Sequence, residues 1–265
     1  MSHQALDRRT ESVLDVVREA GELALEYFRR PVAIEDKRSH GLYDPVTEAD
    51  RRVEELIRAR LSELFPGHRI VGEEQGSSGE GDSYWLIDPI DGTRAFISGM
   101  PLWGILLALV EEGRPAIGIV HQPFTGETFV GAGDESVLLR GKERTRLRVR
   151  EAATLEEAVL YSTHPEFIFG MEEGYEVLQR RCRLQRWGGD CYAYCMLALG
   201  FVDLVIEGML MPYDIVPLIP IVEGAGGVVT DLEGGTPMAG GSVVASGNER
   251  LHREVLAILN REPSD

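Results

Sequence analysis

A short apolar run at residues 84–88 predicts a buried strand that ends in a dense set of acids. The string that begins at this strand end reads Asp88-Pro89-Ile90-Asp91-Gly92-Thr93. Glu73 ends a neighbouring predicted strand at residues 69–72. No lysine stands near these acids in the sequence, and buried carboxylates without basic partners repel one another. A fold that buries these acids together therefore needs a cation between them.

The geometry of the string favours a metal site beside a phosphate site. The proline stiffens the turn, so Asp88 and Asp91 can aim at one point and the Ile90 carbonyl can add a neutral oxygen. Such oxygen donors suit a hard divalent ion such as Mg²⁺. The backbone N–H groups of Gly92 and Thr93, with the Thr93 hydroxyl, suit a phosphate. A metal-assisted phosphatase is the first functional hypothesis, and a turn with an Asx cap is the structural alternative.

Two further acids have both a structural and a functional interpretation. Asp214 begins a predicted helix at residues 214–225, where it would be an N-cap. Capping is compatible with metal ligation, because one carboxylate oxygen can cap while the other coordinates. Asp50 falls within a predicted helix at residues 45–64, where a solvated helix face is the alternative to a functional role.

Composition excludes several classes of function. The chain has 265 residues, with 44 acids against 27 bases and a net charge of -17, which argues against binding nucleic acid or anionic membranes. The longest apolar stretch, near residues 100–110, is too short to cross a bilayer, and the charged N-terminus lacks a signal-peptide core. Three cysteines without CxxC spacing indicate reduced thiols, so we expect a cytoplasmic protein.

Hydrophobic periodicity predicts two N-terminal helices, then an antiparallel sheet, then alternating strands and helices. The expected helices cover residues 5–30, 45–64, 170–181, 191–199, 214–225 and 249–260. The expected strands cover residues 69–72, 84–88, 102–111, 114–122, 128–132, 136–139, 159–162, 202–207, 228–231 and 242–246, with a flexible turn at 76–81. The pattern changes near Arg150. We expect an N-terminal α+β half (1–150) with most metal ligands and a C-terminal α/β half (151–265) with the substrate loop and the last ligand.

Other metal and nucleotide sites lack support. The six histidines form no HxxxH or HxH set, so a zinc site is not predicted. No GxGxxG or Gx4GK[ST] fingerprint is present. The acids also lack the alternating positions of an EF-hand calcium loop.

Five motifs in order along the chain resemble the inositol monophosphatase family of metal-dependent phosphatases. They are Asp44-Pro45-Val46-Thr47-Glu48-Ala49-Asp50, Gly72-Glu73-Glu74, the Asp88–Thr93 string, the segment from Glu207 to Asp214, and Gly224-Ala225-Gly226-Gly227. The resemblance covers nearly the whole chain. It implies a layered αβαβα sandwich, dependence on two or three Mg²⁺ ions, a homodimer and frequent sensitivity to lithium.

The resemblance also implies roles for individual residues. Glu73, Asp88 and the Ile90 carbonyl would bind one metal ion, and Asp88, Asp91 and Asp214 a second, with Glu73 helping to hold a weaker third. Gly92 and Thr93 would bind the phosphate, while Thr93 with Asp50 would orient the attacking water. The catalytic groups would thus be Asp50, Thr93 and Glu73. Lys37 and Asp44 would bound a mobile loop that closes over the metals.

The chain departs from the inositol pattern around the expected substrate. The departures are Arg94-Ala95-Phe96 after the Asp-Gly-Thr, Tyr213 before Asp214, and Trp187-Gly188-Gly189-Asp190-Cys191-Tyr192 in place of a small-residue loop. These segments resemble the histidinol-phosphate phosphatase subgroup, which implies hydrolysis of histidinol phosphate in histidine biosynthesis. The substrate-binding residues would be Arg94, Gly189, Asp190 and Glu207. Asp190 and Glu207 suit the amine and imidazole of that substrate, whereas inositol carries only hydroxyls.

Several alternatives stay open at this point. Asp190 has the simpler interpretation of a helix N-cap, and Glu207 that of a strand end. An inositol-1-phosphate or broad sugar-phosphate phosphatase is the same-family alternative. An aspartyl-nucleophile phosphatase of the haloacid dehalogenase type would need its two acids two apart and near the N-terminus. A catalytically silent metal-binding or regulatory protein on this scaffold is the alternative from a different class.

Overall fold

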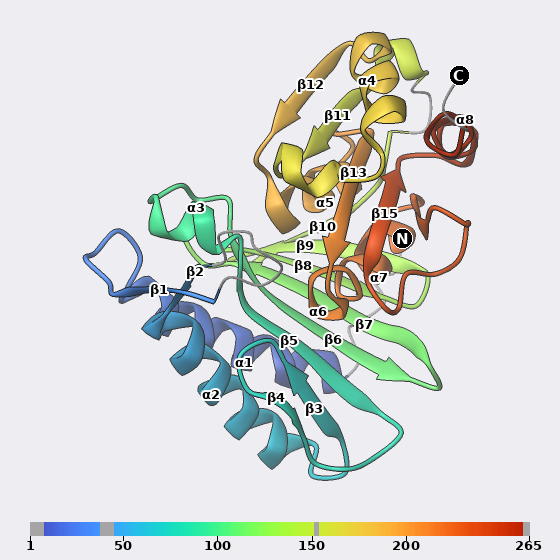
Figure 1. Ribbon diagram of the computed structural model, residues 1–265. Coiled ribbons are helices and arrows are strands. Elements are labelled where there is room, and N and C mark those ends of the chain that lie inside the picture. Colours follow the sequence, from blue (N-terminus) through green and yellow to red (C-terminus); the bar gives the residue numbers. More distant parts are fainter. Residues whose placement is uncertain (1–7, 38–44, 151–153, 262–265) are drawn as a thin grey trace.

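The computed structural model describes residues 8–37, 45–150 and 154–261 (Figure 1). Its α-helices are α1 (Arg8–Leu25), α2 (Glu48–Leu64), α3 (Thr93–Ile97), α4 (Glu172–Arg181), α5 (Asp190–Ala198), α6 (Pro212–Ile215), α7 (Leu218–Gly224) and α8 (Glu249–Leu259). Two 3-10 helices are η2 (Leu155–Glu157) and η3 (Pro165–Ile168). The strands are β1 (Ile34–Asp36), β2 (Pro45–Thr47), β3 (Arg69–Gly72), β4 (Gly76–Ser78), β5 (Tyr84–Asp91), β6 (Gly104–Glu111), β7 (Arg114–Gln122), β8 (Glu127–Ala132), β9 (Glu135–Arg140), β10 (Glu143–Arg146), β11 (Val159–Ser162), β12 (Leu184–Trp187), β13 (Leu204–Leu210), β14 (Val228–Asp231) and β15 (Gly241–Ser246).

These elements form alternating layers of helices and sheets (Figure 1). Helices α1 and α2 cover the outer face of an eight-stranded sheet through one apolar cluster. Helices α5 and α7 fill the space between that sheet and a five-stranded sheet. Helices α4 and α8 cover the far face of the second sheet. The predicted αβαβα sandwich is confirmed.

The large sheet brings two predicted strand ends together. Its strand order is β10-β9-β8-β7-β6-β5-β3-β4, and β3 and β5 are its parallel pair, with Gly72 opposite Ile87. Parallel strands end at the same edge of a sheet. Glu73 and Asp88, the residues that follow this register pair, therefore stand side by side, and the Glu73 N–H donates to the Ile87 carbonyl at 3.1 Å.

The second sheet has the order β12-β11-β13-β15-β14 and lies wholly in the C-terminal half of the chain. One buried cluster nevertheless takes residues from both sheets, for example Leu106 from β6 and Val205 from β13. This shared core joins the two halves, and the predicted division near Arg150 stays a prediction.

Helix α7 sits directly on the backbone of the large sheet. Gly118 in β7 and Gly131 in β8 face each other in register. A Cβ at Gly118 would lie 2.0 Å from the Pro217 carbonyl oxygen, and one at Gly131 would lie 2.3 Å from the Pro220 backbone. These glycines therefore let the segment that follows Asp214 approach the sheet.

Several predicted boundaries were wrong. The helix expected at 5–30 ends at Leu25, and its residues 5–7 lie outside the described ranges. The helix expected at 214–225 is broken into α6 and α7, because Pro217 has no N–H to continue the ladder. The flexible turn expected at 76–81 contains strand β4.

The strands that the sequence analysis missed are short. Besides β4 they are β1, β2, β10 and β12. Strands β4, β10 and β12 lie at sheet edges, and β1 pairs with β2 in a separate two-stranded ribbon. Strands of this kind lack the long apolar alternation on which periodicity depends. Over the described ranges, none of the helices has both the length and the apolar character needed to traverse a bilayer.

Candidate active site

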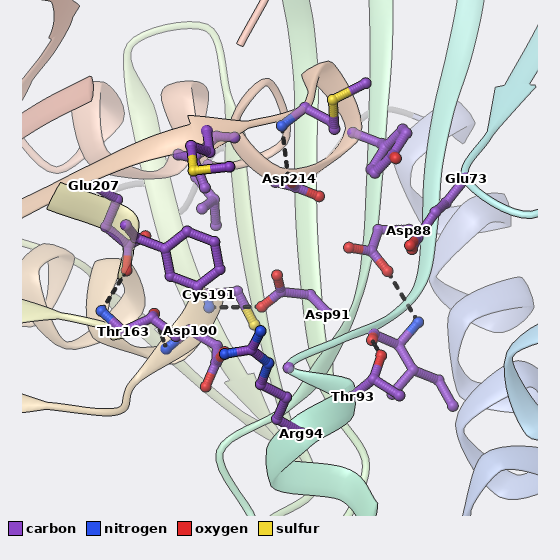
Figure 2. A pocket seen from close by; sticks show the side chains of 18 of the residues that line it. Glu73, Asp88, Asp91, Thr93, Arg94, Thr163, Asp190, Cys191, Glu207 and Asp214 are labelled. Atoms are coloured by element: carbon purple, nitrogen blue, oxygen red, sulfur yellow. Dashed lines mark hydrogen bonds between the residues drawn. The ribbon is translucent and has the colours of Figure 1, made fainter. Parts of the chain in front are cut away.

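Three of the four acids predicted to converge do so at one end of strand β5. Asp88, Asp91 and Asp214 each offer a carboxylate oxygen, and these oxygens lie within 4.8 Å of one another (Figure 2). Residues three apart in a regular strand point to opposite faces. Here the pairing of β5 with β6 shifts between Asp88, opposite Leu106, and Asp91, opposite Gly104. This irregularity contains Pro89 and changes the direction of the side chains, so that the carboxylates of Asp88 and Asp91 point to the same place.

Each of these carboxylates is also held by a backbone N–H group. Asp88 accepts from Ile90 at 3.0 Å, Asp91 from Cys191 at 2.7 Å, and Asp214 from Met211 at 2.7 Å. Asp214 is therefore the N3 residue of the capping box of α6, not the N-cap that we expected. One oxygen of each carboxylate is fixed, which leaves the other for a ligand.

Burial raises the pKa of Asp88, Asp91 and Asp214, that of Asp88 and Asp214 to well above the usual value. Repulsion from the neighbouring carboxylates adds to the shift at Asp88 and Asp214. A divalent cation would offset this cost, since its two positive charges attract all of the surrounding carboxylates. Three carboxylate oxygens at this spacing form a hard donor set that fits a magnesium-type ion.

Glu73 lies at the other end of the cavity from Glu207, with the aspartates between them (Figure 2). The expectation that no lysine neutralises these acids was wrong, because Lys37 donates to Glu73 at 3.1 Å and also contacts Glu74. Burial raises the pKa of the Glu73 carboxyl, and Lys37 opposes that shift. Lys37 is the described residue of the predicted mobile loop, while the rest of it, to Asp44, lies outside the described ranges.

The turn that was predicted to bind phosphate begins directly after Asp91. Gly92 has φ 80°, a left-handed conformation that glycine adopts without strain, and Thr93 opens α3. The Thr93 hydroxyl lies 2.9 Å from the Ile90 carbonyl and 3.3 Å from Asp50 Oδ1. Asp50 is buried, with its other oxygen accepting from Thr47 in the capping box of α2. The alternative of a solvated helix face for Asp50 was therefore wrong.

The far wall of the cavity carries a second pair of acids. Asp190 and Glu207 line the same cavity of about 410 Å³, together with Arg94. Asp190 opens α5 with φ 45°, and its N–H donates to Thr163 Oγ1 at 3.1 Å. The helix thus begins at Asp190 itself, not after it. Glu207 accepts from the Thr163 N–H at 2.7 Å.

Gly189 was predicted to bind substrate, but in the structure it packs against neighbouring side chains. A Cβ there would lie 2.8 Å from Ala193 Cβ and 3.1 Å from the Tyr161 ring. Gly189 is not one of the described residues that line the cavity. Its small size lets the chain pass close to Tyr161 on the way into α5.

The family follows from comparison with known proteins. The model of the inositol monophosphatase family matches residues 5–264. The chain belongs to the inositol monophosphatase family. It is 35% identical to a histidinol-phosphatase of Chlorobaculum parvum, over 95% of this chain and 96% of the relative. It is 33% identical to a fructose-1,6-bisphosphatase/inositol-1-monophosphatase of Thermotoga maritima, over 95% and 96%. The solved inositol monophosphatase of Zymomonas mobilis superposes with a TM-score of 0.85 at 36% identity, covering 98% of this chain and 100% of that one.

Members of the inositol monophosphatase family are metal-dependent phosphatases, and the acidic cluster described above agrees with that chemistry. The chain is accordingly a phosphatase whose substrate is a small phosphate ester. The relatives carry both histidinol-phosphatase and inositol-monophosphatase names, so membership alone leaves the leaving group open.

Sequence reasoning missed the residues that support Asp190 and Glu207. Tyr194 donates its hydroxyl to Glu207 at 3.0 Å, and Thr163 contacts both Glu207 and Asp190. A tyrosine three residues after a predicted helix start carries no signal of this role.

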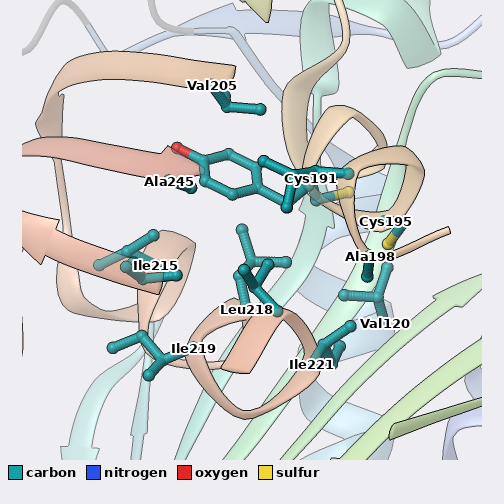
Figure 3. Packing of buried hydrophobic residues seen from close by; sticks show 14 of the residues in the cluster. Val120, Cys191, Cys195, Ala198, Val205, Ile215, Leu218, Ile219, Ile221 and Ala245 are labelled. Carbon is teal, nitrogen blue, oxygen red and sulfur yellow. The ribbon is translucent and has the colours of Figure 1, made fainter. Parts of the chain in front are cut away.

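Cys191 and Cys195, expected to be buried and structural, do pack in the core between the sheets (Figure 3).

Proposed function

We propose that the chain is a Mg²⁺-dependent phosphomonoesterase that hydrolyses histidinol phosphate to histidinol and phosphate. The observation that carries the substrate assignment is the second pair of acids, Asp190 and Glu207, on the wall beside the aspartate cluster. Inositol offers only hydroxyl groups to such a wall. Histidinol phosphate offers an amine and an imidazole, and both can carry positive charge at neutral pH.

The energetics of the two acids support a cationic partner. Burial raises the pKa of Glu207 to about 7 and that of Asp190 well above its usual value, with repulsion from Asp91 adding to both shifts. A bound cation would lower both pKa values again. Asp190 also occupies a left-handed backbone conformation, at φ 45°, which costs about 1 kcal/mol or more in a residue with a Cβ. Strain of this kind is common at ligand sites.

The residues present fit the metal ions that the reaction needs. We propose that Glu73, Asp88 and the Ile90 carbonyl hold one Mg²⁺, and that Asp88, Asp91 and Asp214 hold a second. Glu73 would share in a weaker third. When bound, the ions supply an activated water and charge stabilisation for the leaving oxygen.

The side chains around the ions have distinct tasks in this proposal. The Thr93 hydroxyl and Asp50, 3.3 Å apart, orient the attacking water and accept its proton. The backbone N–H groups of Gly92 and Thr93 bind the phosphate oxygens. Arg94 lies close enough to Asp190 to lower the pKa of that carboxyl, which favours the ionised form that a cationic substrate group would bind.

A comparison of substrates tests the proposal. We expect kcat/KM for histidinol phosphate to exceed that for inositol-1-phosphate, with activity dependent on Mg²⁺. Asp190→Asn should lower kcat/KM for histidinol phosphate much more than for inositol-1-phosphate, because it removes charge but little volume. A wild-type preference for inositol-1-phosphate would instead support the alternative, an inositol or broad sugar-phosphate phosphatase.

We also propose a homodimer that works in the cytoplasm. The family resemblance supports the dimer, and the free thiols of Cys182, Cys191 and Cys195 suit a reducing compartment. Light scattering of the purified chain would test the dimer directly, since a monomer mass would contradict it.

A further inference from the structure

A buried ion pair on helix α2 lies behind the Glu73 turn. Glu54 is fully buried and Arg58 nearly so, and Arg58 Nε donates to Glu54 Oε1 at 2.7 Å. The two residues are one helical turn apart. Burying an ion pair is costly unless further hydrogen bonds satisfy both partners. The identity of those further partners therefore indicates what the pair is for.

Both partners bind the chain that directly follows Glu73. Glu54 Oε2 accepts from the Glu74 N–H at 2.7 Å, and Glu54 Oε1 accepts from the Gln75 N–H at 3.0 Å. The Arg58 guanidinium donates to the Gly76 carbonyl and, at 2.8 Å, to Ser78 Oγ. The pair thus holds the turn between β3 and β4 through its backbone.

The residue before Glu73 is shaped to admit the same pair. A Cβ at Gly72 would lie 2.3 Å from Glu54 Oε1 and 2.8 Å from an Arg58 nitrogen. Only a residue without a side chain lets the carboxylate come so close to the strand. Glu73 is therefore fixed from both sides, and its own N–H is bound to Ile87 of β5.

One face of α2 serves two parts of the active site. Asp50, at the first turn of the helix, reaches Thr93, and Glu54, four residues later, reaches the Glu73 turn. Because a helix is stiff, α2 adds to the pairing of β3 with β5 in setting the spacing between the Gly92-Thr93 turn and Glu73.

We propose that Glu54, held by Arg58, is a positioning residue that fixes the Glu73 turn and thereby sets the affinity of the protein for a divalent ion at Glu73. The inference rests on the proposed function, in which Glu73 is a metal ligand. Glu54 touches neither ion nor substrate in this scheme.

The test uses the full chain and Mn²⁺ alone, with free Mn²⁺ counted by electron paramagnetic resonance. Glu54→Gln keeps the shape but replaces one acceptor oxygen with a donor, which would face a backbone N–H or Arg58. We expect its dissociation constant for the ion that depends on Glu73 to rise about tenfold or more, as for other residues that orient a ligand from behind. Arg58→Lys should act in the same direction to a smaller extent, and it serves as the milder variant should Glu54→Gln not fold.

Asp203→Asn is the matched control. Asp203 is a fully buried carboxylate that binds Arg150 at 2.7 Å and the Val159 N–H at 2.8 Å. It is not one of the described residues that line the cavity. Its variant should lose stability and keep wild-type Mn²⁺ affinity.

The outcomes separate the inference from the proposed function. If Glu73→Gln binds Mn²⁺ like the wild type, the proposed metal site is wrong. If Glu73→Gln weakens binding but folded Glu54→Gln or Arg58→Lys does not, only the positioning role fails. Equal weakening by Asp203→Asn would also overturn it, since the effect would then follow general stability.

Discussion

Replacing Asp91 with Asn should stabilise the metal-free protein while it removes activity. Asp91 is one of three carboxylates within 4.8 Å of one another, and its Oδ2 accepts the Cys191 N–H. The Asn side-chain oxygen can still accept that hydrogen bond. The substitution therefore changes the charge of the cluster and one ligand, but little packing.

The size of the stabilisation follows from the spacing. Two unit charges 4.8 Å apart repel by about 3 kcal/mol at an effective dielectric constant of about 20. Asp91→Asn removes two of the three pairs, but the raised pKa values of the cluster mean that protons already relieve part of the repulsion. We expect a net gain of about 1–3 kcal/mol, which corresponds to a rise in Tm of about 2–10 °C for a chain of this size.

Thermal unfolding in EDTA at pH 8, with and without Mg²⁺, measures this effect. The variant should have a higher Tm than the wild type in EDTA and a smaller rise in Tm on adding Mg²⁺. Its kcat should fall about a hundredfold or more, because the loss of a metal ligand costs several kcal/mol of transition-state stabilisation. A Tm in EDTA several degrees below that of the wild type would refute the view that the three aspartates repel one another, and wild-type-like turnover would remove Asp91 from the metal site.

Three further predictions concern catalysis, pH and packing. Thr93→Ala should lower kcat about a hundredfold, in the range for loss of a proton-transfer group, while Thr93→Ser should keep most of the activity; equal loss in both would point to the lost methyl group instead. Burial raises the pKa of Glu207 from 4.5 to about 7, so the folded protein binds more protons than the unfolded chain between these values, and the Tm of the metal-free protein should fall as pH rises from 4.5 to 7. A Tm that rises over that window would contradict the raised pKa of the buried Glu207 carboxyl. Gly131→Ala, whose Cβ would meet the Pro220 backbone at 2.3 Å, should cost about 1–3 kcal/mol in urea unfolding, and Gly67→Ala, with nothing within 4 Å, should cost far less.

Parts of the site were predictable because their signals are local. The strand at 84–88 is a continuous apolar run, and the acids at its end follow it in the chain, so their shared position needs no long-range information. Gly92 and Thr93 come directly after them, so the turn that they form also lies beside the acids. Glu73 was predicted to lie alongside because it follows a neighbouring strand, and the structure shows that this strand, β3, is parallel to β5 and ends at the same edge.

Other parts were not predictable because distant segments supply them. Lys37 reaches Glu73 from the residue that follows β1, a three-residue strand too short to show an apolar alternation. That ion pair overturned the idea of an unpaired acidic site. Glu54 and Arg58 look like an ordinary i,i+4 pair on an exposed helix face. Their burial depends on strands β3 and β4 lying across α2, which periodicity does not report.

The order of residues along the chain by itself determined the layered fold, the family, and the acids at the end of β5, because apolar periodicity and short motifs are properties of neighbours in sequence. Tertiary structure alone decided how many carboxylates share one point, how burial shifts their pKa values, and which side chains hold them from behind. The physical reason is that desolvation and Coulomb repulsion depend on distances between segments up to a hundred or more residues apart, such as Asp91 and Cys191 or Asp214.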